Sequence, residues 1–358
     1  MYENYQDPIF RKRETLLPDY VPEHLPNRTT EIETISQLIK ESLEGRITHI
    51  FIHGTPGTGK TASILHIFEK LHEKTDTITS YVNCFNKNTR MAILYSIFLK
   101  FYKEKRPTRR MPSRRGIAYD ELLESFLEEL DKTKAKIVVC LDEVDQIKEN
   151  ELIYDLSRTS KKIQIISISN DEFAFKNIDP RTRSSMYPLE TIQYSPYSYK
   201  QMVEIIKYKV EEAFQKDVVT KEAVEKLAEF SADHNGDVRV ARETLLRAGQ
   251  LANSNGDEKV DLRHIKETLE KSRHAKPMKI ISELSEKEKD ILNLLPEEGV
   301  FYPEFYKFYK SEKGKLGDRM FRNYLKKLSE LNLIKMERKG MGGSYFISLN
   351  VPKELMKE

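Results

Sequence analysis

A short glycine-rich stretch that ends in a lysine and a threonine offers the clearest chemistry in the sequence. Residues 54–61 read Gly-Thr-Pro-Gly-Thr-Gly-Lys-Thr and fit the pattern G-x-x-x-x-G-K-[ST]. Glycine lets backbone amides turn inward with no Cβ in the way, so several donors can converge on a chain of phosphates. The lysine would reach the β and γ phosphates, and the threonine hydroxyl would bind magnesium. The pattern predicts a site for ATP or ADP with Mg2+, formed by Gly57, Thr58, Gly59, Lys60 and Thr61.

The residues on either side supply the elements that such a site needs. Residues 47–53 alternate like a buried strand, and the apolar residues of 64–71 recur at helical spacing. A helix that begins near Lys60 adds its positive end to the phosphate site. A glycine turn before an ordinary helix is the alternative, but it leaves the adjacent lysine and threonine unexplained.

Two carboxylates follow a second predicted strand. Residues 137–141 form an apolar run, and Asp142 and Glu143 come directly after it. We expect Asp142 to hold magnesium through water, and Glu143 to orient or deprotonate the attacking water. Residues 163–169 predict another strand, after which Asn170 is the candidate for fixing that water.

Arginines on two further segments could contact a nucleotide. Arg181 and Arg183 lie on a predicted loop, where either could face a neighbouring subunit's nucleotide as a finger, although most such arginines simply face solvent. The sequence Gly-Asp-Val-Arg at 236–239 opens a predicted helix, with Asp237 as its cap. Arg239 could touch the γ phosphate from there. A helical lid that distinguishes ATP from ADP is the functional interpretation, and a plain helical bundle is the alternative.

Composition places the chain among multidomain proteins without membrane spans. Its 358 residues suggest two or three domains, and 33% of them are charged. No apolar run is long enough to span a bilayer and the first residues lack a signal-peptide pattern, so we expect a cytoplasmic protein. DNA binding by the basic residues described below would associate it with the nucleoid. The two cysteines, Cys84 and Cys140, lie in or beside apolar runs and are expected to be buried without forming a metal site or disulfide.

The second half of the chain is typical of two further domains. From residue 196 onward helices are predicted over 197–214, 220–232, 237–252 and 261–273, and Lys276-Pro277 marks a boundary. Beyond it, helices over 286–295, 303–309 and 318–331 precede a hairpin of 333–336 and 345–349, which is typical of a winged helix. We therefore predict residues 1–195 as a nucleotide-binding core, 196–276 as an α-helical lid and 277–358 as a winged-helix domain.

Basic residues gather at two places that suit DNA. On the predicted helix 318–331 the basic residues lie at spacings of three and four, away from a core face that includes Phe321. This stripe would enter a major groove, and the wing would reach a neighbouring phosphate or minor groove. A basic stretch over 103–115 is suited to phosphate contacts. The candidate DNA-binding residues are Arg319, Arg322, Lys326, Arg338, Lys339, Arg109, Arg110, Arg114 and Arg115. A solvated loop and a protein-binding winged helix are the respective alternatives.

Taken together, these motifs resemble the archaeal initiator proteins related to the origin recognition complex and the cell division cycle licensing factor. The resemblance runs from residues 17–23 and 25–28 through 54–61 and 141–145 to 195–197, 236–239 and the winged helix. It implies an α/β P-loop AAA+ domain with a five-stranded parallel sheet, followed by an α-helical lid and a winged helix. It also implies sensor roles for Asn170 and Arg239, and places 103–115 in an initiator-specific insertion. The nucleotide contacts that it implies outside the P-loop are Tyr197, Lys209 (where an arginine is usual) and, on the N-terminal arm, Val21 and Arg28.

The function implied is that of an ATP-regulated replication initiator. Such a protein would bind origin double-stranded DNA and help load the replicative helicase, with slow ATP hydrolysis as a switch and paralogous initiators as possible partners. Two alternatives remain open at this stage. One is a DNA-binding AAA+ motor of the branch-migration type, and the other is an origin-binding regulator or antagonist of initiation.

Overall fold

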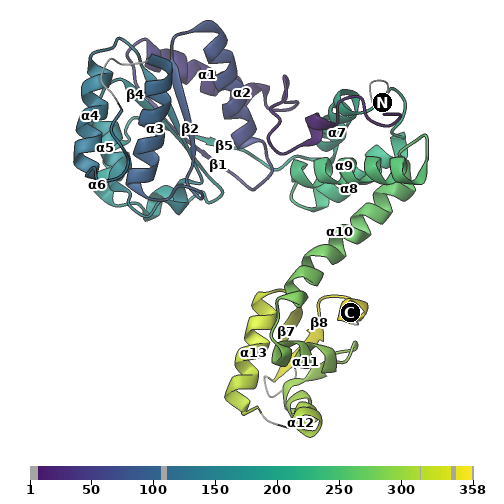
Figure 1. The fold of residues 1–358 in the computed structure, drawn as a ribbon. Coiled ribbons are helices and arrows are strands. Elements are labelled where there is room, and N and C mark those ends of the chain that lie inside the picture. Colours follow the sequence, from purple (N-terminus) through teal and green to yellow (C-terminus); the bar gives the residue numbers. More distant parts are fainter. Residues whose placement is uncertain (1–6, 106–110, 315, 340–343, 357–358) are drawn as a thin grey trace. The chain divides into compact units, whose positions relative to one another are not determined.

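The structure, a computed structural model, describes residues 7–105, 111–314, 316–339 and 344–356 (Figure 1). It divides into two compact units, Met1–Ile265 and Lys266–Glu358, each with a core of its own. The predicted border between nucleotide-binding core and lid lies inside the first unit, and the division of the chain into three domains stays a prediction. None of the described helices combines the length and the apolar character needed to cross a lipid bilayer.

A five-stranded parallel sheet forms the centre of the first unit, as the resemblance implied. Its strands are ordered β2-β3-β4-β1-β5. They are β1 (His49–His53), β2 (Ile78–Asn83), β3 (Ile137–Asp142), β4 (Ile163–Ser169) and β5 (Leu189–Gln193). The sequence patterns described above predict β1, β3 and β4, and residues 77–83 likewise predict the strand β2. β5 was missed because it lies at the edge of the sheet, where the exposed Glu190, Thr191 and Gln193 interrupt the apolar pattern.

Helices cover both faces of this sheet (Figure 1). Successive strand residues point to opposite faces, so Val138 and Cys140 pack with one set of helices and Val139 and Leu141 with the other. The first face carries α1 (Thr29–Leu43) and α2 (Lys60–Lys74). The second carries α3 (Arg90–Lys105), α4 (Tyr119–Asp131) and α5 (Glu151–Thr159). Cys84 and Cys140 are both buried, which confirms that part of their prediction.

The parallel register brings the predicted site residues to one edge of the sheet. His53, the last residue of β1, is paired with Ser169, the last residue of β4. Asp142, at the end of β3, is paired with Ile168. Ligands of open parallel sheets bind at this carboxyl edge. The glycine loop after β1, the acids after β3 and Asn170 after β4 therefore meet in space.

A bundle of helices completes the first unit. It contains α7 (Tyr199–Ala213), α8 (Lys221–Asp233) and α9 (Val238–Asn255). Phe10 of the N-terminal arm packs against it, with its ring 4.9 Å from that of Phe214. The short helix η1 (Arg13–Leu16) also contacts α7 and α9. Asp237 caps α9 by accepting a 2.9 Å hydrogen bond from the Arg239 amide, which confirms the predicted cap.

Two predicted boundaries differ from the structure. Arg181 and Arg183 lie on the short helix α6 (Pro180–Ser185) and not on a loop, because Asp179 caps that helix and proline fits its first turn. The helix predicted to end at residue 273 is α10 (Leu262–Ser282), which continues through Pro277. Proline removes one backbone donor, but the lysines, alanine and methionine around it are strong helix formers.

The second unit is a winged helix, as predicted. It consists of α11 (Glu286–Leu294), α12 (Tyr302–Lys313) and α13 (Asp318–Glu330) with the strands β6 (Val300–Phe301), β7 (Ile334–Arg338) and β8 (Tyr345–Leu349). The strands form an antiparallel sheet in the order β6-β8-β7. Phe305, Phe321 and Ile347 lie fully buried at its core. Residues 340–343, the glycine-rich segment between the two strands of the predicted hairpin, lie outside the described residues.

Candidate functional site

The glycine loop between β1 and α2 is packed tightly against its surroundings. Gly57 and Gly59 have positive φ angles of +76° and +91°. A Cβ on Gly57 would lie 1.8 Å from Oδ1 of Asp237, and one on Gly59 would lie 2.9 Å from the hydroxyl oxygen of Tyr197. Glycine is thus required both by the backbone conformation and by the close approach of the helical bundle. Without a Cβ at these two positions the backbone of the loop can closely approach a chain of phosphates, which fits the predicted ligand.

Lys60 is held over this loop. Its side chain is buried, and Nζ donates hydrogen bonds to the carbonyls of Gly54 (2.6 Å) and Thr55 (2.9 Å) and to Oδ1 of Asn170 (3.0 Å). Burial lowers the pKa of Lys60 to about 8. The structure therefore brings the predicted phosphate-binding lysine and the predicted water-fixing asparagine into direct contact.

The predicted magnesium ligands also meet. Oγ1 of Thr61 lies 2.7 Å from Oδ2 of Asp142, and the Tyr81 hydroxyl donates to the same oxygen at 2.7 Å. Oδ1 of Asp142 accepts a 2.9 Å hydrogen bond from the Glu143 amide. Hydroxyl and carboxylate oxygens are the donors that magnesium prefers, so this pair fits the ion. Tyr81 was not among the residues predicted for the site, because its position beside Asp142 depends on the pairing of β2 with β3.

Glu143 adopts the left-handed backbone conformation, with φ +55°. Burial, followed by the neighbouring charges of Asp142 and Asp145, raises the pKa of its carboxyl group, whereas Arg239 opposes that shift. A carboxylate with a raised pKa is suited to accept a proton from water near neutral pH. The predicted role of Glu143 is consistent with this environment.

A cavity of about 510 Å3 opens over these groups. It is bordered by the glycine loop, the strand ends, the N-terminal arm and the start of α9. Among the predicted residues it is lined by Gly57, Thr58, Gly59, Lys60, Thr61, Asp142, Glu143, Asn170, Arg239 and Val21. Ten residues that the sequence analysis predicted for the site therefore line this one cavity.

The start of α9 touches the glycine loop directly. The Val238 amide donates a 3.2 Å hydrogen bond to the Gly57 carbonyl. Arg239 forms an ion pair with Asp237, with Nη2 2.7 Å from Oδ2. The Arg239 guanidinium is therefore held by a carboxylate at the rim of the cavity, within electrostatic reach of Glu143. A phosphate in the cavity would compete with Asp237 for it.

A smaller cavity of about 100 Å3 adjoins the first one and has a more apolar wall. Tyr197 and Lys209, implied as nucleotide contacts, line this space and not the larger one. Nζ of Lys209 lies 2.8 Å from Oε2 of Glu212 and 5.0 Å from the centre of the Tyr20 ring. The aromatic and proline side chains around it form a slot suited to a flat base.

Arg28 lies behind the glycine loop and does not line either cavity. It is buried, and Nε donates hydrogen bonds of 2.9 Å to the Thr58 carbonyl and to the Tyr197 hydroxyl. Nη1 pairs with Glu31 at 2.6 Å. These contacts indicate that Arg28 positions the loop, and a direct nucleotide contact by Arg28 stays a prediction.

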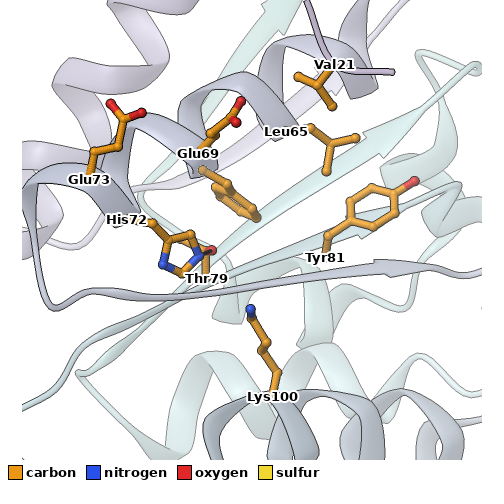
Figure 2. Close-up of a pocket in the computed structure, with 9 residues that line it drawn as sticks. Val21, Leu65, Glu69, His72, Glu73, Thr79, Tyr81 and Lys100 are labelled. Carbon is orange, nitrogen blue, oxygen red and sulfur yellow. Dashed lines mark hydrogen bonds between the residues drawn. The ribbon is translucent and has the colours of Figure 1, made fainter. Parts of the chain in front are cut away.

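An open groove of about 660 Å3 lies beside the larger cavity, between α2, β2 and α3 (Figure 2). The groove is lined by Leu65, Glu69, His72 and Glu73 on α2 and by Thr79 and Tyr81 on β2, and Figure 2 shows the His72 ring next to Thr79. Nε2 of His72 is 2.7 Å from Oγ1 of Thr79. The groove borders the nucleotide cavity at Val21, Leu65 and Tyr81, so Tyr81 lies in the wall between the two spaces.

The two candidate finger arginines differ in their surroundings. Arg181 donates a 3.0 Å hydrogen bond to the Tyr154 hydroxyl, and its guanidinium carbon lies 4.3 Å from the centre of that ring. Arg183 is half-buried, and its side chain makes no hydrogen bond or ion pair with any residue that the structure describes. Arg183 is therefore the one of the pair with a guanidinium available to a partner.

In the second unit, the predicted DNA-binding side chains on α13 all face solvent. Arg322 pairs with Asp318 at 2.8 Å and lies over the Tyr302 ring, and Nζ of Lys326 lies 3.7 Å from Oε1 of Glu330. Arg319 has no such partner among the described residues. Phosphates would therefore have to compete with acids for two of these three cations.

The remaining predicted DNA contacts are divided between the wing and the basic stretch. On the wing, Arg338 lies over the Tyr345 ring, and Nζ of Lys339 is 2.8 Å from Oε2 of Glu337. In the basic stretch, Arg114 and Arg115 are exposed after the end of α3. Arg109 and Arg110 lie outside the described residues.

The fold and the site together define an AAA+ ATPase. A glycine loop at the carboxyl edge of a parallel sheet, paired acids after β3 and a helical lid against the loop are the features of that class. Residues 45–174 match the family described as an AAA domain. Residues 203–270 match the Cdc6 AAA+ ATPase-type lid domain.

The chain belongs to the family of ORC1-type DNA replication proteins. It is 34% identical over 268 residues to ORC1-type DNA replication protein 1 of Sulfurisphaera tokodaii, an alignment that covers 72% of this chain and 65% of the relative. It is 33% identical over 277 residues to the ORC1-type protein of Desulfurococcus amylolyticus, covering 73% and 68%. The chain thus spans just under two thirds of the length of the first relative and just over two thirds of the length of the second.

Solved structures agree with the fold. The Aeropyrum pernix ORC1 protein, determined in complex with DNA, superimposes with a TM-score of 0.76 at 24% identity, covering 99% of this chain and 97% of that one. Cdc6p of Pyrobaculum aerophilum gives a TM-score of 0.64 at 20% identity, with 97% of each chain covered. The fold of AAA+ domain, lid and winged helix is therefore shared.

Proposed function

We propose that this protein is an ATP-regulated DNA replication initiator that binds origin duplex DNA and helps load the replicative helicase. Family membership supports the initiator class. The observation that carries the regulatory part is the contact between lid and phosphate loop, in which Val238 and Asp237 lie directly against Gly57. A change in what the loop binds would act on the lid through this contact.

The residues of the cavity have separable roles in this proposal. Lys60 positions the β and γ phosphates, and its hydrogen bond from Nζ to Asn170 keeps both side chains at the same end of the cavity. Glu143 orients the attacking water and accepts its proton. Magnesium, held by Thr61 and Asp142, would supply a positive charge that neutralises the phosphates. Positioning and charge neutralisation account for most of the catalysis of phosphoryl transfer.

Hydrolysis serves as a slow switch in this proposal. Arg239 is paired with Asp237, and a γ phosphate would draw the guanidinium away from that carboxylate. Because Asp237 also caps α9 and packs on Gly57, a new partner for Arg239 changes the contact between lid and loop. ATP and ADP would then favour different lid positions.

DNA binding is assigned to the winged helix and the basic stretch. The A. pernix ORC1 protein, which shares this fold, was determined in complex with DNA, and this supports a DNA partner here. The exposed cations on α13 suit phosphates and base edges in a major groove. A duplex DNA partner places the protein at the nucleoid, where the helicase and paralogous initiators would also bind.

A loading assay tests this function. The host's replicative helicase is incubated with an origin-containing duplex, the protein and ATP, and the helicase that resists a high-salt wash is counted. We expect retention that requires the protein, the origin and ATP. Origin binding with reduced helicase retention would identify an antagonist of initiation. Rapid, DNA-stimulated hydrolysis with movement of a branched junction would identify a motor.

A further inference from the structure

Arg242 lies where the two cavities meet. It is one turn beyond Arg239 on α9, half-buried, and it lines both the larger and the smaller cavity. Tyr20, Gly59, Ala62 and Val238 are the other residues common to both spaces. Any ligand that extends from the glycine loop into the aromatic slot must pass this position.

Arg242 differs from the other cations of the site in having no partner. Lys60 donates to three oxygens, Arg239 pairs with Asp237 and Lys209 pairs with Glu212. Arg242 makes no hydrogen bond or ion pair with any residue in the described ranges. Burial, followed by the nearby charge of Arg239, lowers its pKa, yet an arginine stays protonated at neutral pH. Asp237, Glu243 and Asp19 oppose that shift electrostatically, but none of them forms a hydrogen bond or ion pair with Arg242. The guanidinium donors are therefore available to an anion in the cavity.

The position of Arg242 indicates which part of a nucleotide supplies that anion. The terminal phosphates belong at the glycine loop with Lys60, and a base fits the slot formed by side chains such as Tyr20, Tyr197 and Tyr208. The sugar and the phosphate attached to it connect these two ends. Guanidinium groups bind phosphates through two parallel hydrogen bonds.

We propose that Arg242 binds the sugar-proximal phosphate of the nucleotide. This assignment rests on the proposed nucleotide-binding function of the site. ATP and ADP both carry this phosphate, so Arg242 contributes equally to the affinity for either. Arg239 lines only the larger cavity and interacts electrostatically with Glu143, so it contributes more to the affinity for ATP than to the affinity for ADP. The lid thus carries one arginine for holding nucleotide and another for distinguishing its state.

Calorimetric titration of the full chain with ADP and with a slowly hydrolysed ATP analogue tests this division. Arg242→Ala is expected to weaken both affinities by the same factor, about 10- to 100-fold, as for the removal of a charged hydrogen bond. Arg239→Ala is expected to weaken the analogue more than ADP. Arg247→Ala is the matched control, because Arg247 is exposed on the same helix and pairs with Glu243. It should change neither affinity.

Arg242→Gln keeps most of the length of the side chain and guards against a loss of packing. It should reproduce the equal loss of affinity at an unchanged melting temperature. Unchanged affinities in both Arg242 variants, or a loss confined to the ATP analogue, would overturn the assignment. Failure of the unsubstituted protein to bind either nucleotide would instead refute the proposed function, so the two failures are distinguishable.

Discussion

Tyr81 donates a hydrogen bond of 2.7 Å to Oδ2 of Asp142, the oxygen that also accepts from Thr61. Burial, followed by the charge of Asp142, raises the pKa of Tyr81 far above its usual value, so the phenol remains a donor. The parallel pairing of β2 with β3 brings the two residues together. The carboxylate expected to hold magnesium is thus fixed by a residue from the neighbouring strand.

Replacing Tyr81 with phenylalanine removes this donor and little else. We expect the magnesium concentration for half-maximal ATP binding to rise on the order of tenfold, because a hydrogen bond to a charged group contributes about 1.5 kcal/mol. Magnesium titrations of ATP binding measure this effect. Binding of ADP in the absence of magnesium should be unchanged. An unaltered magnesium requirement would show that Tyr81 only fills space in the wall of the cavity.

Lys60→Ala is expected to abolish nucleotide binding, and the pH dependence of binding gives a finer test. Burial lowers the pKa of Lys60 to about 8, and a bound phosphate chain would raise it again. The affinity for ADP should be constant between pH 7 and the pKa near 8, then fall by up to about tenfold per pH unit above it, because binding must take up a proton.

Lys60→Arg is the control for this pH dependence. Arginine keeps its charge throughout the range, so any binding that this variant retains should not decline above pH 8. Calorimetry in two buffers of different ionisation enthalpy would report the proton uptake directly. An affinity of the unsubstituted protein that stays level to pH 9.5 would contradict the assigned role of Lys60.

His49 gives a prediction on stability. It is buried at the start of β1, where Nδ1 accepts a 3.0 Å hydrogen bond from the Ile165 amide, and burial lowers its pKa from 6.5 to about 4. The unfolded chain binds the proton first, so stability is complete above pH 6.5 and is lost as pH falls toward 4. The decrease in the free energy of unfolding should reach about 3 kcal/mol.

Denaturant unfolding between pH 7 and pH 4 measures this decrease. His49→Asn retains an acceptor for the Ile165 amide but has no group that titrates, so its stability should decline less steeply over the same range. Parallel slopes for the two proteins would show that other groups cause the acid sensitivity.

Arg183, and not Arg181, is predicted to act as the finger. Arg181 is held by Tyr154 in its own chain, whereas the Arg183 side chain has no polar partner among the described residues. A finger acts on a neighbouring molecule, so hydrolysis per molecule should rise with protein concentration. Arg183→Ala should remove that rise and lower the hydrolysis rate of the assembled protein by about tenfold or more. The affinity for nucleotide should not change. If Arg181→Ala has this effect and Arg183→Ala does not, the assignment is reversed.

DNA binding through α13 predicts a particular salt dependence. Replacing Arg319 and Arg322 with alanine should weaken binding to duplex DNA and reduce the slope of log affinity against log salt by about 0.9 for each phosphate that the variant no longer neutralises. Lys287 and Lys307 are exposed on α11 and α12, and their double alanine variant is the matched control. Equal slopes for the two double variants would move the DNA-binding surface elsewhere on the protein.

Local motifs allowed much of this site to be predicted from the sequence. The residues from Gly57 to Thr61 and the acid Asp142 follow buried strands, and the parallel sheet brings any such strand ends to one edge. Arg239 could be predicted because a cap residue and a helix start precede it. In each case the chemistry and the element that positions it are neighbours in the chain.

The remaining features depend on contacts between distant segments. In the sequence Tyr81 looks like an ordinary strand residue, and only the pairing of β2 with β3 brings it to Asp142. Arg242 looks like any other helix arginine, and only the packing of the lid against the glycine loop brings it to the cavity. Arg28 looks like a surface cation of the arm, but the fold buries it behind Thr58. The edge strand β5 has too little apolar alternation to be predicted alone.

The most direct test of the initiator function is a footprint of the purified protein on its host's replication origins. The origin fragments are compared with a random duplex of equal length, in the presence of ATP and of ADP. We predict a protected, repeated site at the origins, with a pattern that differs between the two nucleotides. Equal and weak protection of origin and random DNA with either nucleotide would contradict the claim that this protein is an ATP-regulated origin-binding initiator.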